Sequence, residues 1–135
     1  MASFTKFYSF AEALAEKKHN LGSDQLKVAL TNVAPSQSNT VLADITQIAY
    51  TNLSAREITT SSSAQTTGTY KLVLNDLTLT ASGAVATFRY VVIYNDTATN
   101  DELIGYADYG SAVTMANLDE FIIDFDGSLG ALQLV

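Results

Sequence analysis

The sequence predicts an all-β fold, mainly an antiparallel β-sandwich or jelly roll, with a short N-terminal α-helix. The chain has 135 residues, the usual size of one domain, and 47% of them are hydrophobic, which is enough to build a core. After Gly22, β-branched and aromatic residues dominate, and polar turn clusters divide them into short segments. We therefore expect a single domain, with a helical segment at residues 1–22 and a β-sandwich at residues 23–135.

The helix is predicted from apolar residues that recur at a spacing of three to four, which places them on one face. These residues are Phe7, Phe10, Ala11 and Leu14. Ser9 and Glu12 have the spacing of a capping box at the start of the helix. Gly22 is expected to end this segment, because glycine readily adopts the left-handed conformation found after a helix.

The first part of the β region contains three predicted features. Leu26, Val28 and Leu30 alternate with less apolar residues, which indicates a half-buried strand. The polar tract at residues 61–68 is expected to be either flexible or a solvent-exposed edge. Apolar and more polar residues alternate in residues 70–74 and again in residues 77–79. Asn75-Asp76 separates the two segments, which predicts that they pair as a hairpin.

The second part centres on residues 85–94, which are apolar on both faces and so predict a central strand. We expect Phe88, Tyr90, Val92 and Tyr94 on one face, and Val91 and Ile93 on the other. Further strands are predicted at residues 103–109, 112–115, 121–125 and 131–135. The total of about eight short strands, with frequent turns between them, is typical of a sandwich or jelly roll.

The composition argues against catalysis and bound cofactors. The chain has no cysteine, which excludes disulfides and thiolate metal sites. Its single histidine, His19, is expected to be a helix-end residue favoured by the helix dipole. Asp124 starts a sequence that resembles a calcium loop, but Leu129 and Val135 occupy the positions that require glycine and glutamate. No Gly-x-Ser-x-Gly motif occurs. We therefore expect no catalytic residue, no metal, no cofactor and no small-molecule substrate.

The charge is unevenly distributed along the chain, whose formal net charge is −7. Lys6, Lys17, Lys18 and Lys27 are four of the seven basic residues, and every charged residue after Arg89 is acidic. An acidic surface repels phosphate backbones, so we expect no nucleic-acid partner. The segregation either serves solubility or places a partner at the basic N-terminal end.

Neither a secretory signal nor a membrane span is predicted. The start of the chain lacks the basic region and apolar run of a signal peptide, and no apolar run reaches the roughly 20 residues that span a bilayer. We therefore expect a soluble protein that is made in a cytoplasm and has no membrane partner.

The candidate partner-binding residues combine local basic charge with a surplus of aromatic side chains. In the N-terminal segment they are Phe4, Lys6, Phe7, Tyr8, Lys17 and Lys18. Tyr106 and Tyr109 join them, because tyrosine is enriched in protein interfaces. These two tyrosines are three residues apart, so we expect them on opposite sides of a strand, with at least one exposed.

A resemblance to a known family covers most of the chain, in strand and turn sequences at residues 19–32, 41–45, 68–72, 80–83, 88–97, 103–111 and 121–127. These sequences resemble those of small head decoration, or cement, proteins of tailed bacteriophages. The resemblance implies a virion protein that binds the outside of the capsid shell. Such a protein would act as a dimer or trimer and reinforce the contacts between major capsid proteins, and it would be made in the bacterial host cytoplasm.

Two other classes of protein fit the same sequence. A phage tail or fibre-base protein has a similar composition. A carbohydrate-binding or adhesion module is the second alternative, and it predicts exposed aromatic side chains on one face. The chain has no tryptophan, the residue that sugar-stacking platforms use most readily.

Overall fold

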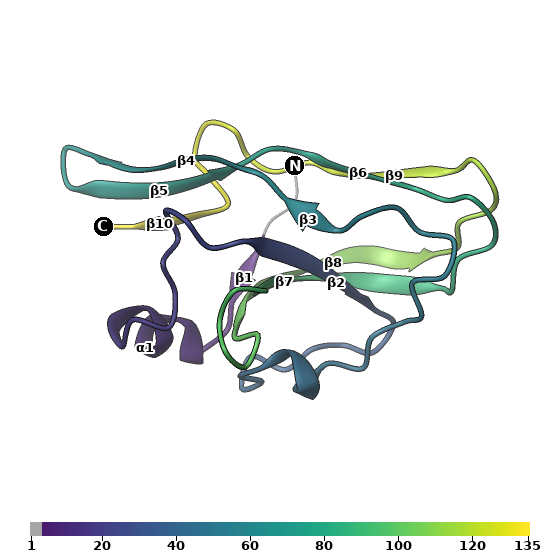
Figure 1. Cartoon of the computed structure of the whole chain (residues 1–135), viewed down its shortest axis with the longest axis horizontal. Helices are drawn as coiled ribbons and strands as arrows, with labels where there is room; N and C mark the ends of the chain where they lie inside the picture. The colour runs from purple at the N-terminus through teal and green to yellow at the C-terminus, as the bar shows by residue number, and fades with distance from the viewer. Residues whose placement is uncertain (1–3) are drawn as a thin grey trace.

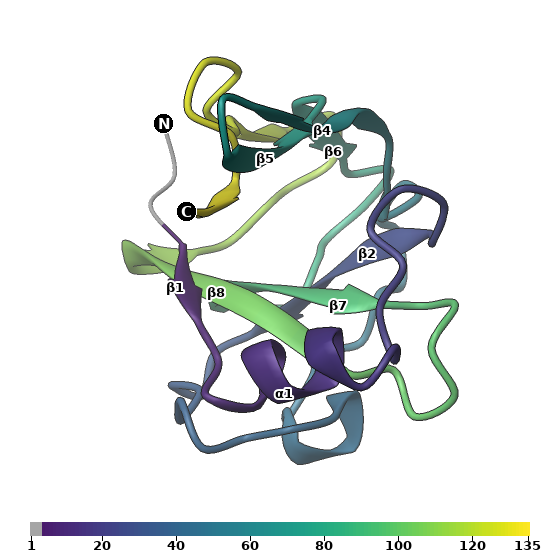
Figure 2. The same ribbon diagram turned by 90° about the vertical axis from the view of Figure 1, so that its left-hand side faces the viewer.

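The computed structural model describes residues 4–135, which form two layers of antiparallel strands (Figures 1 and 2). One layer is a five-stranded sheet in the order β1-β8-β7-β2-β3. Its strands are β1 (Thr5–Lys6), β2 (Leu26–Thr31), β3 (Glu57–Ile58), β7 (Phe88–Asn95) and β8 (Leu103–Val113). The predicted all-β class with one short α-helix is confirmed.

The second layer consists of a three-stranded sheet and a two-stranded sheet, in the orders β10-β5-β4 and β6-β9. Its strands are β4 (Thr60–Thr66), β5 (Thr69–Leu74), β6 (Leu77–Thr80), β9 (Glu120–Ile123) and β10 (Leu132–Leu134). In Figure 1 the β4–β5 hairpin and β10 lie at one end of this layer, and β6 and β9 lie at the other.

The helix α1 (Ser9–Ala15) lies on the side of the five-stranded sheet that faces away from the second layer (Figure 2). It is shorter than expected because Lys17 adopts the left-handed conformation, with φ of 68°. The N–H of Lys18 then bonds to the carbonyl of Ala13, and that of Lys17 to the carbonyl of Leu14. This is a Schellman arrangement, so Lys17 takes the role predicted for Gly22. The prediction of a capping box at Ser9 is also wrong, because Tyr8 is the N-cap residue and its side chain makes no capping hydrogen bond.

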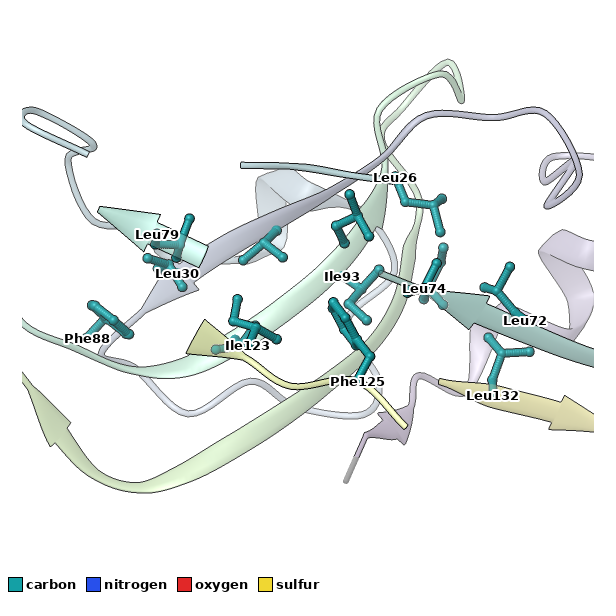
Figure 3. Close-up of a cluster of buried hydrophobic side chains, with 14 of the residues drawn as sticks. Leu26, Leu30, Leu72, Leu74, Leu79, Phe88, Ile93, Ile123, Phe125 and Leu132 are labelled. Carbon is teal, nitrogen blue, oxygen red and sulfur yellow. The ribbon is translucent and has the colours of Figure 1, made fainter. Parts of the chain in front are cut away.

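The main core fills the space between the two layers. Apolar side chains from both layers point toward one another there, as Figure 3 shows for Leu26, Leu30 and Ile93 on one side and Leu72, Leu79 and Ile123 on the other. A smaller cluster packs on the opposite face of the five-stranded sheet and includes Phe7, Val92 and Leu103. The central position of β7 is therefore confirmed, whereas β2 is buried on both faces and not on one as expected.

The predicted side-chain alternation of β7 fails at its first residue. The pairing with β8 is irregular between Phe88 and Tyr90. Phe88 consequently lies in the main core with Val91 and Ile93, while Val92 and Tyr94 belong to the cluster on the other face. A bulge changes which face a side chain occupies, and the amino-acid pattern alone does not reveal it.

The predicted hairpin around Asn75-Asp76 is wrong, because β5 pairs with β4 and β10 while β6 pairs with β9. The Asp76 carboxylate accepts a hydrogen bond from the N–H of Phe125, at 2.9 Å, where the chain passes between these two small sheets. The true hairpin joins β4 and β5 through Thr67 and Gly68, which both have positive φ, at 50° and 81°. Residues 61–68 therefore include an exposed edge strand, one of the two expected alternatives.

The chain also contains a short 3₁₀ helix at Leu42–Asp44. Within residues 4–135, none of the helices has the length and apolar character needed to cross a bilayer.

Candidate functional site

A cavity of about 860 Å³ opens beside the C-terminal end of α1, and we call it the polar cavity. Its walls come from three parts of the fold: residues 17–22 after the helix, residues 97–100 of the β7–β8 loop, and Ser63 and Tyr70 of the β4–β5 hairpin. All three parts lie in the left-hand half of the molecule in Figure 1. The volume is within the range of about 300–1,000 Å³ that is typical of small-molecule sites.

Asn95, the last residue of β7, organises a buried polar cluster at this cavity. Its side-chain carbonyl accepts hydrogen bonds from the N–H groups of Thr97 and Ala98, at 3.0 and 3.2 Å. Its amide nitrogen donates to Asp24 Oδ2 at 2.7 Å and lies 3.0 Å from His19 Nδ1. Asn95 is fully buried, and these contacts use both of its amide hydrogens and its carbonyl oxygen.

The hydrogen bonds of Asn95 determine the protonation state of His19. Because two backbone N–H groups hold the Asn95 oxygen, its nitrogen must face the imidazole ring. Nδ1 of His19 is therefore the acceptor, and the proton of the neutral ring is on Nε2. In a protonated ring Nδ1 would also carry a hydrogen, so two donors, Nδ1–H and the Asn95 amide, would face each other.

The surroundings of His19 also favour its neutral form. The side chain is buried against the ring of Phe10, with the ring centroids 5.4 Å apart. This burial lowers the pKa of His19 below its ordinary value of 6.5, although Glu102 and Asp24 act in the opposite direction. The expected role, a helix-end residue favoured by the helix dipole, is wrong, because α1 ends at Ala15 and the His19 side chain is buried in the polar cluster.

Two polar atoms of the cluster have no hydrogen-bond partner. They are Nε2 of His19, which is a donor, and Oε2 of Glu102, which is an acceptor. Both residues line the polar cavity and both are more than nine-tenths buried. An unsatisfied buried polar atom costs about 1–3 kcal/mol, so native proteins contain few of them.

Hydrogen bonds donated by backbone N–H groups hold the two loops of the site together. The N–H of Asn20 donates to Asp24 Oδ2 at 2.8 Å, which closes the segment after the helix. The N–H of Gln25 donates to Thr97 Oγ1 at 2.8 Å, and the N–H of Asp96 donates to the Gln25 carbonyl at 2.9 Å. The start of the β7–β8 loop, at Asp96 and Thr97, is therefore tied to the segment that carries His19.

The candidate contact residues of the N-terminal segment lie in different environments. Phe7 is buried, with 2% of its surface exposed, and packs against Tyr106, while Phe4 is half-buried and stacks on Phe125. These two phenylalanines contribute to the packing of the fold, and Phe7 exposes almost no surface to a partner. The remaining four are exposed: Lys6, Tyr8, Lys17 and Lys18.

Tyr106 and Tyr109 lie on opposite sides of β8, as expected. Tyr106 is half-buried against Phe7, which belongs to the smaller cluster. Tyr109 is 59% exposed and contacts Phe121, which packs against the main core. The structure therefore separates Tyr109 from Tyr106, while Lys17 and Lys18 meet at the polar cavity.

Asp24, Asn95 and Glu102 were not predicted from the sequence as members of a site. One signal was present: Asn95 directly follows the apolar run of β7, where a buried amide is unusual. Nothing in the sequence placed this residue beside His19, which is 76 positions away. Within the described part of the chain, no group of three or more histidine or acidic residues has an arrangement that could hold a metal ion.

Comparison with known proteins gives no further assignment, because no protein-family model, curated protein or solved structure matches this chain.

Proposed function

We propose that this protein is a non-enzymatic structural component of a phage virion that binds the outer surface of the capsid shell. In this role it stabilises contacts between major capsid proteins and associates with further copies of itself. The assignment to a capsid rests on the resemblance of its strand and turn sequences to decoration proteins. Attachment to other proteins is supported by one structural observation, the edge strand β4.

Strand β4 is an open edge at one end of the second layer, with β5 on its other side. Its sequence, Thr60–Thr66, contains no charged residue and no proline, and most of its side chains are exposed. Natural proteins usually protect such edges with charges, prolines or bulges, because an open edge pairs with strands of other chains. The pairing irregularity of β4 is confined to its start, between Thr60 and Ser62. This edge is suited to adding a strand from a partner.

The distribution of charge supports an attachment face at the same end of the molecule. Lys17 and Lys18 line the polar cavity together with Ser63 of β4, so the exposed basic residues and the uncharged edge are neighbours. Because the net charge of the chain is −7, an acidic partner is repelled less at this basic end than at the acidic surfaces of the molecule. On a capsid, many copies repeat the same contact, so a small interface per copy is sufficient.

The test is a binding assay with empty capsid shells that lack this protein, prepared from the phage that encodes it. Co-sedimentation and electron microscopy then measure the occupancy of added protein. The wild-type protein should occupy the shells. If it binds only tails, the capsid assignment is wrong and the tail or fibre-base alternative is correct, and if it binds neither, the virion assignment fails.

The variant Ala64→Glu tests the contribution of the β4 edge. The new carboxylate lies opposite Lys71, so the hairpin itself should remain stable. A partner strand would have to cover this charge, and we expect about tenfold weaker shell binding. The matched control is Asn117→Glu, which adds the same charge to the exposed β8–β9 loop. Equal binding by both variants would show that β4 is not the attachment edge.

A double variant tests the basic residues without disturbing the core. Deletion of the N-terminal segment is unsuitable because Phe7, Phe10 and Ala13 are buried. Charge reversal at two exposed positions, Lys17→Glu with Lys18→Glu, avoids this problem. Weaker shell binding that high salt does not restore would support a role for these lysines in attachment.

A further inference from the structure

We propose that the polar cavity binds a small neutral ligand that carries hydroxyl groups, such as a single sugar unit. This inference does not depend on the proposed attachment to a capsid, because it rests on the cavity and on the buried cluster beside it. Three features of the site support it: the lining of the cavity, the balance of charge around it, and the two unpartnered atoms.

The lining combines apolar surface with neutral polar groups. Leu14, Leu21 and Leu134 provide apolar contacts, and Asn20, Asn100 and Thr99 provide amide and hydroxyl groups. Ligand sites typically combine a largely apolar lining with a few well-placed polar groups. A sugar has the matching character, because its ring presents C–H groups on its faces and hydroxyl groups around its edge.

The charged residues of the cavity disfavour a ligand with a net charge. Asp24 and Glu102 line it from the buried cluster, so an anionic group is repelled there. Lys17 and Lys18 are exposed residues of the same lining, so a cationic group is repelled where the cavity meets solvent. A neutral ligand avoids both repulsions.

The two unpartnered atoms have complementary roles that a hydroxyl group satisfies. His19 Nε2 carries a proton, since Asn95 holds Nδ1 as an acceptor, and Glu102 Oε2 is a free acceptor. One hydroxyl oxygen accepts one hydrogen bond and donates another, so it satisfies both atoms. Both atoms are shielded from solvent. Ligand binding is therefore accompanied by a turn of the Glu102 side chain that opens both His19 Nε2 and Glu102 Oε2 to the cavity.

The fold holds the donor of this pair in place. The imidazole ring is fixed by the Asn95 amide on one edge and by Phe10 against its face. The amide is in turn fixed by the N–H groups of Thr97 and Ala98. A donor that is already oriented loses little freedom on binding, which favours affinity for a small ligand.

The experiment is a titration of ¹⁵N-labelled full-length protein with D-glucose, D-galactose and N-acetyl-D-glucosamine, followed by NMR. At least one of these sugars should shift the amide signals of Gly22, Thr99 and Asn100 in a saturable manner. Glucose 6-phosphate and lysine methyl ester serve as the anionic and cationic probes and should shift them less. An absence of saturable shifts with all three neutral sugars, or stronger binding of either charged probe, overturns the proposal.

Two variants test whether the cluster takes part. In Glu102→Gln, the loss of one charge-assisted hydrogen bond should weaken sugar binding about tenfold. The matched control, Glu120→Gln on the exposed start of β9, should bind as the wild-type protein does. Thr99→Trp alters only an exposed residue of the lining and should obstruct the cavity. It therefore tests ligand binding independently of how well Glu102→Gln folds. Unchanged affinity in Thr99→Trp would overturn the proposal.

Discussion

The main core and the polar cluster beside the cavity both contain fully buried residues but are stabilised in different ways. Leu30 in the core and Asn95 in the cluster are both fully buried. The core gains stability from apolar surface removed from water, at about 25 cal/mol per Å², and this gain has no strict directional requirement. The cluster contributes favourably only while each buried donor and acceptor has a partner.

This difference indicates where the molecule departs from its most stable arrangement. The apolar cluster between the sheets is continuous (Figure 3), whereas the polar cluster leaves His19 Nε2 and Glu102 Oε2 without partners. Departures of this kind are concentrated at functional sites, because a fold under selection for stability alone would remove them. The contrast therefore supports a functional role for the cavity end of the molecule.

The largest effect on stability is expected from a substitution that removes a large side chain from the main core. Phe88→Ala removes a fully buried ring that packs edge-on against Phe121 and should lower the free energy of unfolding by about 3–5 kcal/mol. Denaturation in urea measures this loss. Leu118→Ala is the control, because Leu118 is 78% exposed, and a comparable loss in that variant would contradict the assignment of the core.

The next largest effect is expected from Asn95→Leu, which keeps the size of the side chain but removes its hydrogen bonds. The N–H groups of Thr97 and Ala98 lose their acceptor, and Asp24 and His19 lose their donor. We expect a loss of about 2–3 kcal/mol in urea denaturation. Asn117→Leu at an exposed position should be nearly neutral. Stabilisation by Asn95→Leu would show that the cluster is only a defect in the core.

A smaller effect is expected from the titration of His19. Its pKa is lowered in the folded state, chiefly by burial, so below pH 6.5 the unfolded chain binds more protons than the folded chain. Stability should therefore be complete above pH 6.5, decrease as the pH falls through this value, and level off below the folded-state pKa.

The measurement is the unfolding free energy of wild-type protein and His19→Gln over a range from about one pH unit above to about 1.5 pH units below the ordinary histidine pKa. The difference between them isolates the contribution of His19 from those of all other titrating groups. A pH dependence that persists unchanged in His19→Gln would contradict the neutral, Asn95-bound state of the ring.

The smallest effect is expected at the surface. Arg89 and Asp108 form a two-pronged ion pair across β7 and β8, at 2.8 and 3.0 Å, but both side chains are substantially exposed. Asp108→Asn should therefore change stability little, and salt should reduce even that change. A loss as large as that of Asn95→Leu would show that surface charge matters more to this fold than its buried cluster does.

The elements of the fold were predictable where the pattern of residues is local and repeated. The all-β class, the central strand β7 and the exposed edge within residues 61–68 follow from hydrophobic alternation and turn residues. The predictions failed where a choice depends on distant partners. The pattern around Asn75-Asp76 fits a hairpin equally well, and only β9 and β10 draw the two strands into separate sheets. The bulge after Phe88 likewise arises from pairing with β8.

The environments of the candidate contact residues were predictable only in part, for a similar reason. Basic charge and aromatic content identified the N-terminal segment, but they could not separate Phe7, which packs inward, from Tyr8, which is 71% exposed. The sequence by itself therefore determined the class of fold, the acidic character and the absence of cysteine chemistry. Tertiary structure alone decided the polar cavity and its cluster, because hydrogen bonds join Asn95 to His19 and Asp24 across more than half of the chain. Such contacts leave no periodic signal, since their energy depends on positions in space and not on spacing along the sequence.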